Sequence, residues 1–375
     1  MKIGIIIKNF AVGKQFDKSG VPNKSGAEFH AENHALLFKE NGNSVYIMTK
    51  KTYFFTKGRE LFNGIDLVRL HDPFRWLEIF IRMFTTHKNT DAFYIIGTPK
   101  FAVWIILYAQ FMKIPVTLSL TSKVEIFSSQ NGWRNKIFAK CNNYIAISKE
   151  IKRGLIETTS IEENKIYLLP QGIDTENRFY PVDFEQKMNL RINYNIPANK
   201  TVVLFCARVV ENKGIETLKE TWEKVYYTNK DMILLVVGGG VTKLLNELKE
   251  LSLQLENSII ITGEVPKTEE YYQLSDIYIL PSWYEGLSTS TMEALSCGLP
   301  CIGSDIGGIN DLIIHGENGY LAKVKNSDEF AEYVLRLKNN EEMRKEFSRK
   351  ARLNAEKYLD SHKLFSELNR IIKNR

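Results

Sequence analysis

Short apolar strand patterns alternate with helical patterns along most of the chain, and this alternation limits the possible folds more than any other feature. Strands separated by helices form parallel sheets, because a parallel pair needs a long, usually helical, connection. In the first half, strands are expected at residues 3–7, 44–48, 67–70, 93–96, 116–120, 144–146 and 166–169. A second series is expected at residues 202–206, 233–237, 258–261, 277–280 and 300–304. The sequence therefore predicts an α/β fold with two doubly wound parallel sheets.

The length and polarity of the chain indicate where its domains divide. A chain of 375 residues with 44% hydrophobic residues suits two domains, each with its own core. Residues 183–200 are polar and lack a long apolar run, so we expect the linker there and domains at residues 1–182 and 183–355. Residues 356–375 follow as a basic helical pattern with an apolar stripe. The stripe consists of Leu364, Phe365, Leu368, Ile371 and Ile372.

No segment has the pattern of a membrane span or a secretion signal. The longest apolar run, residues 101–112, is too short to cross a bilayer, and the run near the N-terminus is too brief for a signal peptide. We therefore expect a cytoplasmic protein. The four cysteines are expected to be buried free thiols. His30 and His34 share a helical face, but no third metal ligand is evident, so no metal site is expected.

The charges of the chain are unevenly distributed. Residues 1–180 carry a net charge of +9, residues 181–335 carry −9 and residues 336–375 carry +6. A basic face fits an anionic membrane surface, such as the inner face of the plasma membrane, or a phosphorylated acceptor. Nucleic acid is a competing partner, but no recognisable nucleic-acid-binding motif supports it.

Two aromatic and basic segments bear on the membrane hypothesis. Residues 74–84 contain Trp76 among apolar residues with basic interruptions, and a second such segment is Trp133-Arg134-Asn135-Lys136. Residues 74–84 suit either an interfacial helix that docks on lipid or a half-buried helix of the first core. Both interpretations remain open from the sequence.

Two glutamates, Glu285 and Glu293, stand eight positions apart where an expected strand turns into a loop and then a helix. In an open α/β sheet, ligands bind at such carboxyl ends of strands. The N–H groups of Ser288, Thr289 and Ser290 at the expected helix start favour an anion such as a phosphate. The carboxylates can accept hydrogen bonds from sugar hydroxyls. The spacing alone is weak, because exposed glutamates are common near helix starts.

The surrounding motifs add specificity. Residues 263–321 contain the two glutamates, the turn Cys297-Gly298-Leu299-Pro300, a Gly307-Gly308 pair and the run 316–321. This region resembles the signature region of retaining GT-B glycosyltransferases of family 4, the bacterial surface-polysaccharide type. The resemblance implies two Rossmann-like domains facing across a cleft. It also implies that the helix at residues 356–375 packs back on the first domain.

The resemblance assigns roles to the donor side of the site. In the segment 207–214, Arg208 and Lys213 are expected to hold the leaving diphosphate. Glu293 is expected to bind the ribose, and Glu285 the donor sugar together with the backbone of Gly286, Leu287, Ser288 and Thr289. The sequence contains no Asp-x-Asp motif. An Arg and a Lys can stabilise the leaving group instead, so no metal and no cofactor are expected.

Three further matches to the family are weaker. Gly26, in the segment 24–28, resembles the family's Gly-Gly-Ala-Glu element with Ser25 in place of the first glycine, and it would let the backbone approach a diphosphate. A plain helix-entry glycine is the alternative. Gly238 is expected either in a turn or beside the nucleotide. Val265 corresponds to the family's nucleobase loop, with a core or turn role equally open.

The sequence departs from the family at residues 117–122. Many members have a histidine near the position of Thr121, close to the transferred sugar, and this chain has none there. Thr121 or Ser122 could supply a hydroxyl to the sugar or the acceptor, although a threonine at a strand end is structurally ordinary. The identity of the donor sugar therefore stays open.

The sequence favours a retaining, metal-independent glycosyltransferase. It would move a sugar from a nucleoside-diphosphate sugar, expected to be a UDP-sugar, to a hydroxyl of a glycan or lipid-linked acceptor in cell-surface polysaccharide synthesis. The alternatives are a GT-B-shaped sugar-nucleotide epimerase or hydrolase, and a non-catalytic scaffold subunit. A nicotinamide-dependent oxidoreductase is disfavoured, because no Gly-x-Gly-x-x-Gly follows the first expected strand.

Overall fold

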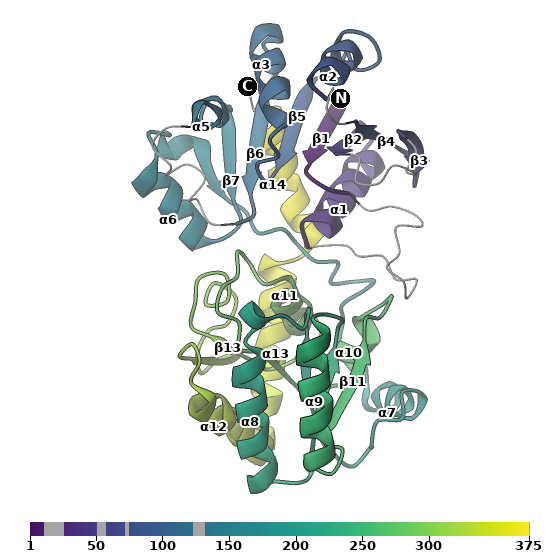
Figure 1. Cartoon of the computed structure of the whole chain (residues 1–375), viewed down its shortest axis with the longest axis vertical. Helices are drawn as coiled ribbons and strands as arrows, with labels where there is room; N and C mark the ends of the chain where they lie inside the picture. The colour runs from purple at the N-terminus through teal and green to yellow at the C-terminus, as the bar shows by residue number, and fades with distance from the viewer. Residues whose placement is uncertain (11–25, 51–57, 72–74, 123–131, 375) are drawn as a thin grey trace. The chain divides into compact units, whose positions relative to one another are not determined.

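The chain forms two compact α/β units. The computed structural model describes residues 1–10, 26–50, 58–71, 75–122 and 132–374 (Figure 1). Unit 1 comprises Met1–Gln171 together with His362–Arg375, and unit 2 comprises Gly172–Ser361. Each unit has its own sheet, as the alternation of strand and helix patterns predicts.

The sheet of unit 1 has the strand order β3-β4-β2-β1-β5-β6-β7-β8. Neighbouring strands are parallel except β3, which runs antiparallel to β4. The chain builds outward from β1 in one direction and then from β5 in the other, so the topological switch point lies between these two strands. The strands are β1 Lys2–Ile7, β2 Ser44–Lys50, β3 Arg59–Phe62, β4 Ile65–Leu70, β5 Ala92–Ile96, β6 Val116–Leu120, β7 Asn143–Ala146 and β8 Ile166–Leu168.

Helices surround this sheet (Figure 1). They are α1 Gly26–Glu40, α2 Arg75–Phe84, α3 Ala102–Met112, α5 Trp133–Phe138, α6 Lys149–Thr158 and α14 Ser361–Lys373, with a 3₁₀ helix at Glu163–Lys165. Among the described residues, no helix is both long enough and apolar enough to span a bilayer.

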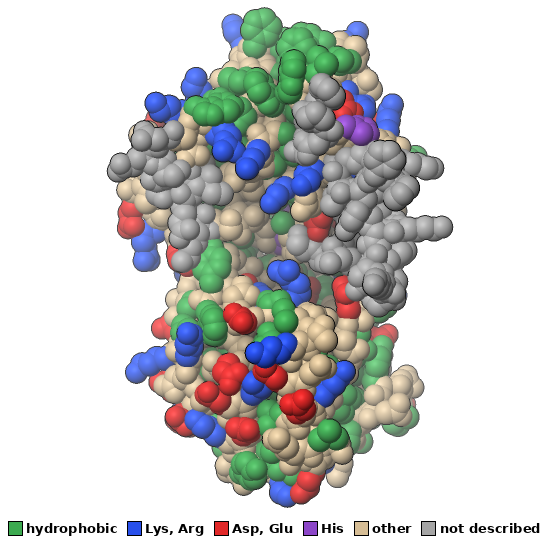
Figure 2. All heavy atoms as spheres, in the orientation of Figure 1, with side chains coloured by type: hydrophobic (Ala, Val, Ile, Leu, Met, Phe, Trp, Pro, Cys, Tyr) green, Lys and Arg blue, Asp and Glu red, His purple; other side chains and the backbone are tan. Residues whose placement is uncertain are grey.

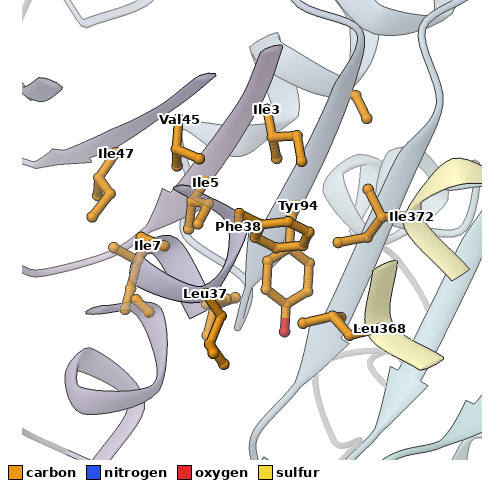
Figure 3. Packing of buried hydrophobic residues seen from close by; sticks show 14 of the residues in the cluster. Ile3, Ile5, Ile7, Leu37, Phe38, Val45, Ile47, Tyr94, Leu368 and Ile372 are labelled. Carbon is orange, nitrogen blue, oxygen red and sulfur yellow. The ribbon is translucent and has the colours of Figure 1, made fainter. Parts of the chain in front are cut away.

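The core of unit 1 joins the two ends of the chain. Apolar side chains from β1, β2, β5, α1 and α14 form one buried cluster, and Figure 3 shows Leu368 and Ile372 beside Phe38 and Tyr94. The ring of Phe38 meets the ring of Phe365 edge to face, with 4.9 Å between the ring centres. Burying each such side chain stabilises the fold by about 1.5–3 kcal/mol. Helix α14 is therefore a structural part of unit 1.

The sheet of unit 2 is entirely parallel and has the order β11-β10-β9-β12-β13-β14. Its switch point lies between β9 and β12, for the same reason as in unit 1. The strands are β9 Thr201–Cys206, β10 Met232–Val237, β11 Ile259–Gly263, β12 Ile277–Leu280, β13 Cys301–Ser304 and β14 Gly319–Ala322. The helices are α7 Phe184–Asn193, α8 Ile215–Thr228, α9 Thr242–Gln254, α10 Glu269–Gln273, α11 Thr289–Ser296, α12 Ser327–Asn339 and α13 Glu341–Tyr358, with a 3₁₀ helix at Glu211–Lys213.

The segment 183–200 is not a linker. It contains α7, which starts with a reciprocal capping box between Asp183 and Gln186. The buried Arg191 donates to the carbonyl oxygen of Leu274 at 2.9 Å and to Asp276 Oδ2 at 2.6 Å, which ties α7 into unit 2. The units divide at residues 171 and 172 instead. Polarity was a misleading signal here, because an ion pair rather than an apolar stripe holds the helix.

All four cysteines are buried and free, as expected. Two strands, β3 and β14, were not expected. The expected strands of both series are all present, with ends that differ by a few residues at most.

Replacing Phe365 with Ala should destabilise unit 1 by about 3–5 kcal/mol, because the change removes a large buried ring and leaves a cavity. The measurement is urea denaturation followed by circular dichroism. The control is Lys373→Ala, which changes an exposed residue of the same helix. An unchanged unfolding midpoint in Phe365→Ala would contradict the role of α14 in this core.

Candidate active site

The predicted donor residues gather at the switch point of unit 2. Arg208 and Lys213 follow β9, and Glu285 follows β12, the strand beside it in the sheet. Because the carboxyl ends of parallel neighbours lie at the same edge, the two loops meet there. The structure thereby brings together residues that are 72 positions apart in the sequence.

Three glycines allow close backbone packing around the loop that carries Arg208. A Cβ atom at Gly214, where φ is +73°, would lie 1.9 Å from the carbonyl oxygen of Pro281. A Cβ atom at Gly238 or Gly240 would lie 2.1 Å from the carbonyl oxygen of Ala207 or Val209, respectively. Each contact is far too short for any other residue. The glycines therefore hold this loop against the ends of β10 and β12, which gives Gly238 a packing role.

Lys213 and Glu285 form an ion pair between the two loops. Lys213 Nζ lies 2.5 Å from Glu285 Oε1, and the Ser282 hydroxyl donates to the same oxygen at 2.8 Å. The two side chains are 16% and 11% exposed. In the described chain, no hydrogen bond reaches Glu285 Oε2, so this oxygen can accept one from a ligand. The N–H of Trp283 also donates to the carbonyl oxygen of Asn212 at 2.9 Å, which fixes the loops together.

Arg208 differs from Lys213 in its surroundings. Its side chain is exposed, and it makes no ion pair or side-chain hydrogen bond with any residue in the described ranges. The backbone around it is held firmly, because the N–H of Val209 donates to the carbonyl oxygen of Gly239 at 2.8 Å. A guanidinium group without a carboxylate partner keeps all its donors for an anionic ligand.

The start of α11 corrects one expectation about backbone donors. The N–H of Ser288 is not free, because it donates to the carbonyl oxygen of Gly308 at 3.1 Å. Ser288 caps the helix, and its hydroxyl accepts from the N–H of Thr291 at 3.2 Å. Thr289 and Ser290 are the first residues of the helix, so no carbonyl four residues earlier in the helix accepts from their N–H groups. These two N–H groups remain candidate donors to a ligand.

Gly286 and Leu287 lead the chain into this helix. Leu287 is buried, so it can offer a ligand its backbone but not its side chain. A Cβ atom at Gly308 would lie 2.6 Å from the carbonyl oxygen of Gly286, so this part of the loop is also closely packed.

Glu293 lies one turn into α11 and is partly exposed. The Tyr272 hydroxyl donates to Glu293 Oε2 at 2.6 Å. Burial raises the pKa of Glu293 to about 7, although this hydrogen bond and the nearby Arg178 act in the opposite direction. Glu293 Oε1 has no hydrogen bond with the described residues and can accept one from a polyol when the carboxylate is ionised.

The remaining predicted residues lie elsewhere. Val265 follows β11 in unit 2 and is partly exposed. Thr121 and Ser122 follow β6 in unit 1 and line a pocket of about 630 Å³. Gly26 is the exposed first residue of α1, beside Ala27, which lines the same pocket. Residues 24 and 25 of its motif lie outside the described residues.

Sequence reasoning missed the residues that position the two carboxylates. Ser282 and Tyr272 each donate to one oxygen of a predicted site glutamate. Both lie within the signature region 263–321, but the resemblance gives neither of them a role. Tyr272 is 21 positions from its partner, so no sequence signal could have identified it. Within the described residues, no group of three or more His, Cys, Asp or Glu side chains is arranged to hold a metal ion.

Two doubly wound units, each with candidate ligand-binding residues at its switch point, are the architecture expected of GT-B proteins. Unit 2 contains a Glycosyl transferases group 1 domain: the family model matches residues 186–354, just under half of the chain. The glycosyltransferase family recognised in the sequence is thereby confirmed for this region, while retention of configuration stays a prediction.

Known proteins extend the likeness beyond unit 2. The chain is 26% identical over 225 residues to N-acetyl-alpha-D-glucosaminyl L-malate synthase of Bacillus anthracis, which covers 59% of the chain and 58% of that protein. It is 25% identical over 361 residues to N,N'-diacetylbacillosaminyl-diphospho-undecaprenol alpha-1,3-N-acetylgalactosaminyltransferase of Campylobacter jejuni, which covers 90% of the chain and 93% of that protein. The crystal structure of HepE from Anabaena in complex with UDP superposes with a TM-score of 0.81 at 17% identity, over 99% of both chains.

The pKa of Glu293 leads to a test of its environment. A carboxyl group whose pKa is about 7 in the folded protein and 4.5 unfolded binds more protons when folded, so the free energy of unfolding should fall as the pH rises from about 4.5 to 7. Glu293→Gln should remove about 1–3 kcal/mol of this fall. Urea denaturation at pH 5 and pH 8 measures it. The matched control is Glu317→Gln, an exposed carboxylate, and equal pH dependence in both variants would contradict the assignment.

Proposed function

We propose that the protein is a glycosyltransferase that binds a nucleoside-diphosphate sugar at the switch point of unit 2 and transfers the sugar to a hydroxyl acceptor. The observation that carries this proposal is the grouping of three side chains at the carboxyl ends of β9 and β12. They are the fixed Lys213–Glu285 ion pair and the exposed Arg208, which forms no ion pair with the described residues. Two cations beside a carboxylate suit a ligand that has a diphosphate next to a sugar.

The donor is assigned to these residues by their chemistry. Arg208 and Lys213 bind the diphosphate, and Thr289 and Ser290 add backbone donors at the start of α11. Glu293 accepts hydrogen bonds from the ribose. Glu285 Oε2 accepts hydrogen bonds from the donor sugar, and the backbone of the 286–289 loop also contacts this sugar. Val265 supports the nucleobase. A UDP-sugar is the proposed donor, supported by the UDP in the HepE structure.

The proposed reaction retains the configuration at the anomeric carbon. The bond between the anomeric carbon and the phosphate oxygen breaks, and the acceptor oxygen bonds to that carbon on the same face. The departing phosphate oxygen takes the acceptor proton, so no side chain serves as general base. Arg208 and Lys213 stabilise the negative charge that grows on the diphosphate, a role that cations can fill without a metal ion.

The proposed acceptor is a glycan or a lipid-linked saccharide of cell-surface polysaccharide synthesis. The Campylobacter relative supports this assignment, because its name describes transfer to a diphospho-undecaprenol-linked sugar and the match covers 90% of the chain.

Replacing Lys213 with Ala should lower turnover by about 100-fold or more, because the leaving diphosphate loses a fixed cation in the transition state. Transfer is measured with candidate UDP-sugars, and calorimetry measures UDP binding with and without a chelator. Lys249→Ala, an exposed lysine on α9, is the control. Normal turnover in Lys213→Ala would remove this residue from the mechanism.

The same assay separates the two rival functions. An epimerase or hydrolase would consume the donor at the same rate without an acceptor. A scaffold subunit would keep its function after simultaneous replacement of Glu285 and Glu293 by Gln, and it would bind no nucleotide. A binding isotherm for UDP that disappears on addition of chelator would contradict metal independence.

We also propose that unit 1 docks on an anionic membrane surface, the inner face of the plasma membrane, through an aromatic face. Helix α2 buries Ile79 and Met83, while its other apolar side chains are between 41% and 59% exposed. The helix is therefore part of the core along one edge and apolar on its exposed side, which combines the two interpretations left open by the sequence. The aromatic face comprises Trp76, Leu77, Phe80, Ile81 and Phe84 on α2, Trp104, Phe111 and Met112 on α3, and Trp133 on α5.

Contacts between the helices support one continuous face. The ring centres of Phe84 and Tyr108 lie 5.2 Å apart, and the Tyr108 hydroxyl donates to the carbonyl oxygen of Met83 at 3.1 Å. These two contacts join α2 to α3. Figure 2 shows hydrophobic side chains gathered over this part of unit 1 with Lys and Arg beside them. Exposed apolar clusters of this kind mark docking surfaces.

The positive charge of unit 1 favours anionic lipid as the partner of the aromatic face. Unit 1 has 28 Lys and Arg against 15 Asp and Glu, a net charge of +13. The exposed Lys113 ends α3, and Lys136 and Lys140 lie in and after α5. Aromatic side chains with lysines beside them favour the interface of an anionic bilayer.

The double variant Phe80→Ser/Phe111→Ser should reduce binding to vesicles of phosphatidylglycerol and phosphatidylcholine by about tenfold, because both rings are exposed in the wild type. Co-sedimentation measures the bound fraction, which should also fall with added salt. Leu253→Ser, an exposed apolar residue of unit 2, is the control. Equal sedimentation of all three proteins, or a concentration-dependent dimer that the double variant abolishes, would contradict membrane docking.

A further inference from the structure

A pocket lies at the switch point of unit 1. It has a volume of about 630 Å³, which is within the range of small-molecule sites. The carboxyl ends of four adjacent strands contribute to it, in the order β2, β1, β5 and β6, together with the first turn of α1. Its lining residues are Ile7, Lys8, Asn9, Ala27, Lys50, Ile96, Gly97, Thr98, Pro99, Lys100, Phe101, Thr121 and Ser122.

Three of these residues are lysines and none is acidic. Within the described ranges, the ammonium groups of Lys8, Lys50 and Lys100 form no ion pair and no hydrogen bond. Many lysines elsewhere are paired, for example Lys187 with Asp276 at 2.7 Å. Like charges gathered without counter-charges raise the positive potential of a pocket, and an anionic ligand would relieve their repulsion.

The backbone holds two of the lysines side by side. The N–H of Lys50 donates to the carbonyl oxygen of Lys8 at 3.3 Å, and the Thr49 hydroxyl donates to the same oxygen at 3.2 Å. On the other side of the switch point, Gly97 takes a φ of +70° and donates its N–H to the carbonyl oxygen of Ser119 at 2.8 Å. This turn leads the chain away from β5 toward Lys100. Lys8 and Lys50 therefore lie at strand ends joined by a backbone hydrogen bond, and Lys100 lies in the turn between β5 and α3.

We infer that this lysine pocket binds the acceptor through a group with more than one negative charge, a diphosphate or a dicarboxylate, held by Lys8, Lys50 and Lys100. The hydroxyls of Thr121 and Ser122 contact the rest of the acceptor. The inference deepens the proposed function and rests on it for the identity of the ligand as an acceptor.

Two relatives support an anionic acceptor. The name of the Campylobacter protein contains a diphospho group, and that of the Bacillus protein contains L-malate, a dicarboxylate. Both groups carry the kind of charge selected by three ammonium groups that form no ion pair with the described residues.

The test uses two probes on protein saturated with UDP, because pyrophosphate alone would also bind at Arg208 and Lys213. Inorganic pyrophosphate and succinate are titrated separately into this complex by calorimetry. At least one of them should bind the wild type, and the triple variant Lys8→Ala/Lys50→Ala/Lys100→Ala should bind it at least about tenfold more weakly, a loss of about 1.4 kcal/mol. Pyrophosphate binding alone indicates a diphosphate-linked acceptor, and succinate binding alone indicates a small acid.

The controls separate this inference from the proposed function. Lys88→Ala changes an exposed lysine of unit 1 outside the pocket and should bind both probes like the wild type. Affinity for UDP and slow hydrolysis of the donor without acceptor should be unchanged in the triple variant, which shows that it is folded. Equal probe binding by the wild type and the triple variant, or none by either, overturns the lysine pocket. Absence of UDP binding in the wild type would overturn the donor assignment. The difference in succinate and pyrophosphate affinity between the wild type and the triple variant, both of which keep Arg208 and Lys213, would then still test the three lysines.

Discussion

The site of unit 2 depends on backbone contacts too close for any side chain. Gly214 packs against the carbonyl oxygen of Pro281, and Gly238 and Gly240 pack against the carbonyl oxygens of the loop around Arg208. These contacts set the distance between the β9 and β12 loops before any charge interaction forms. The ion pair between Lys213 and Glu285 therefore joins two loops whose separation is already fixed. Because the loops are held in place, little conformational entropy is lost when a ligand binds.

Much of the fold could be predicted, because it follows from local apolar patterns. The buried strands are runs of β-branched and other apolar residues that need no partner to be recognised, and their alternation with helices implies parallel sheets. The strands β3 and β14 escaped prediction for a physical reason. Strand β3 lies at the edge of its sheet with an alternating exposed pattern, and β14 is short and begins with glycine.

The candidate site was predictable where side chains follow a motif and not where they support one. Arg208, Lys213, Glu285 and Glu293 stand in recognisable segments, and the structure places all four in the same unit. Tyr272 and Ser282 position the two glutamates through hydrogen bonds that only the folded structure shows. The Ser288 N–H donates to the carbonyl oxygen of Gly308, a contact that no local sequence pattern shows. The lysine pocket was missed because Lys8, Lys50 and Lys100 lie far apart in the sequence, in three separate segments that follow β1, β2 and β5.

The core formed by the first part of the chain is incomplete without helix α14, which lies near its C-terminal end. Its apolar side chains complete a core whose other members come from β1, α1, β2 and β5, so the earliest strands contact residues more than 300 positions later. During synthesis, all residues of unit 2 are made before those of α14, whereas the core of unit 1 stays incomplete until α14 has been made. Unit 2 can then complete its fold before unit 1, the reverse of their order in the sequence, and a chain that stops before α14 would leave the N-terminal core exposed to chaperones and proteases.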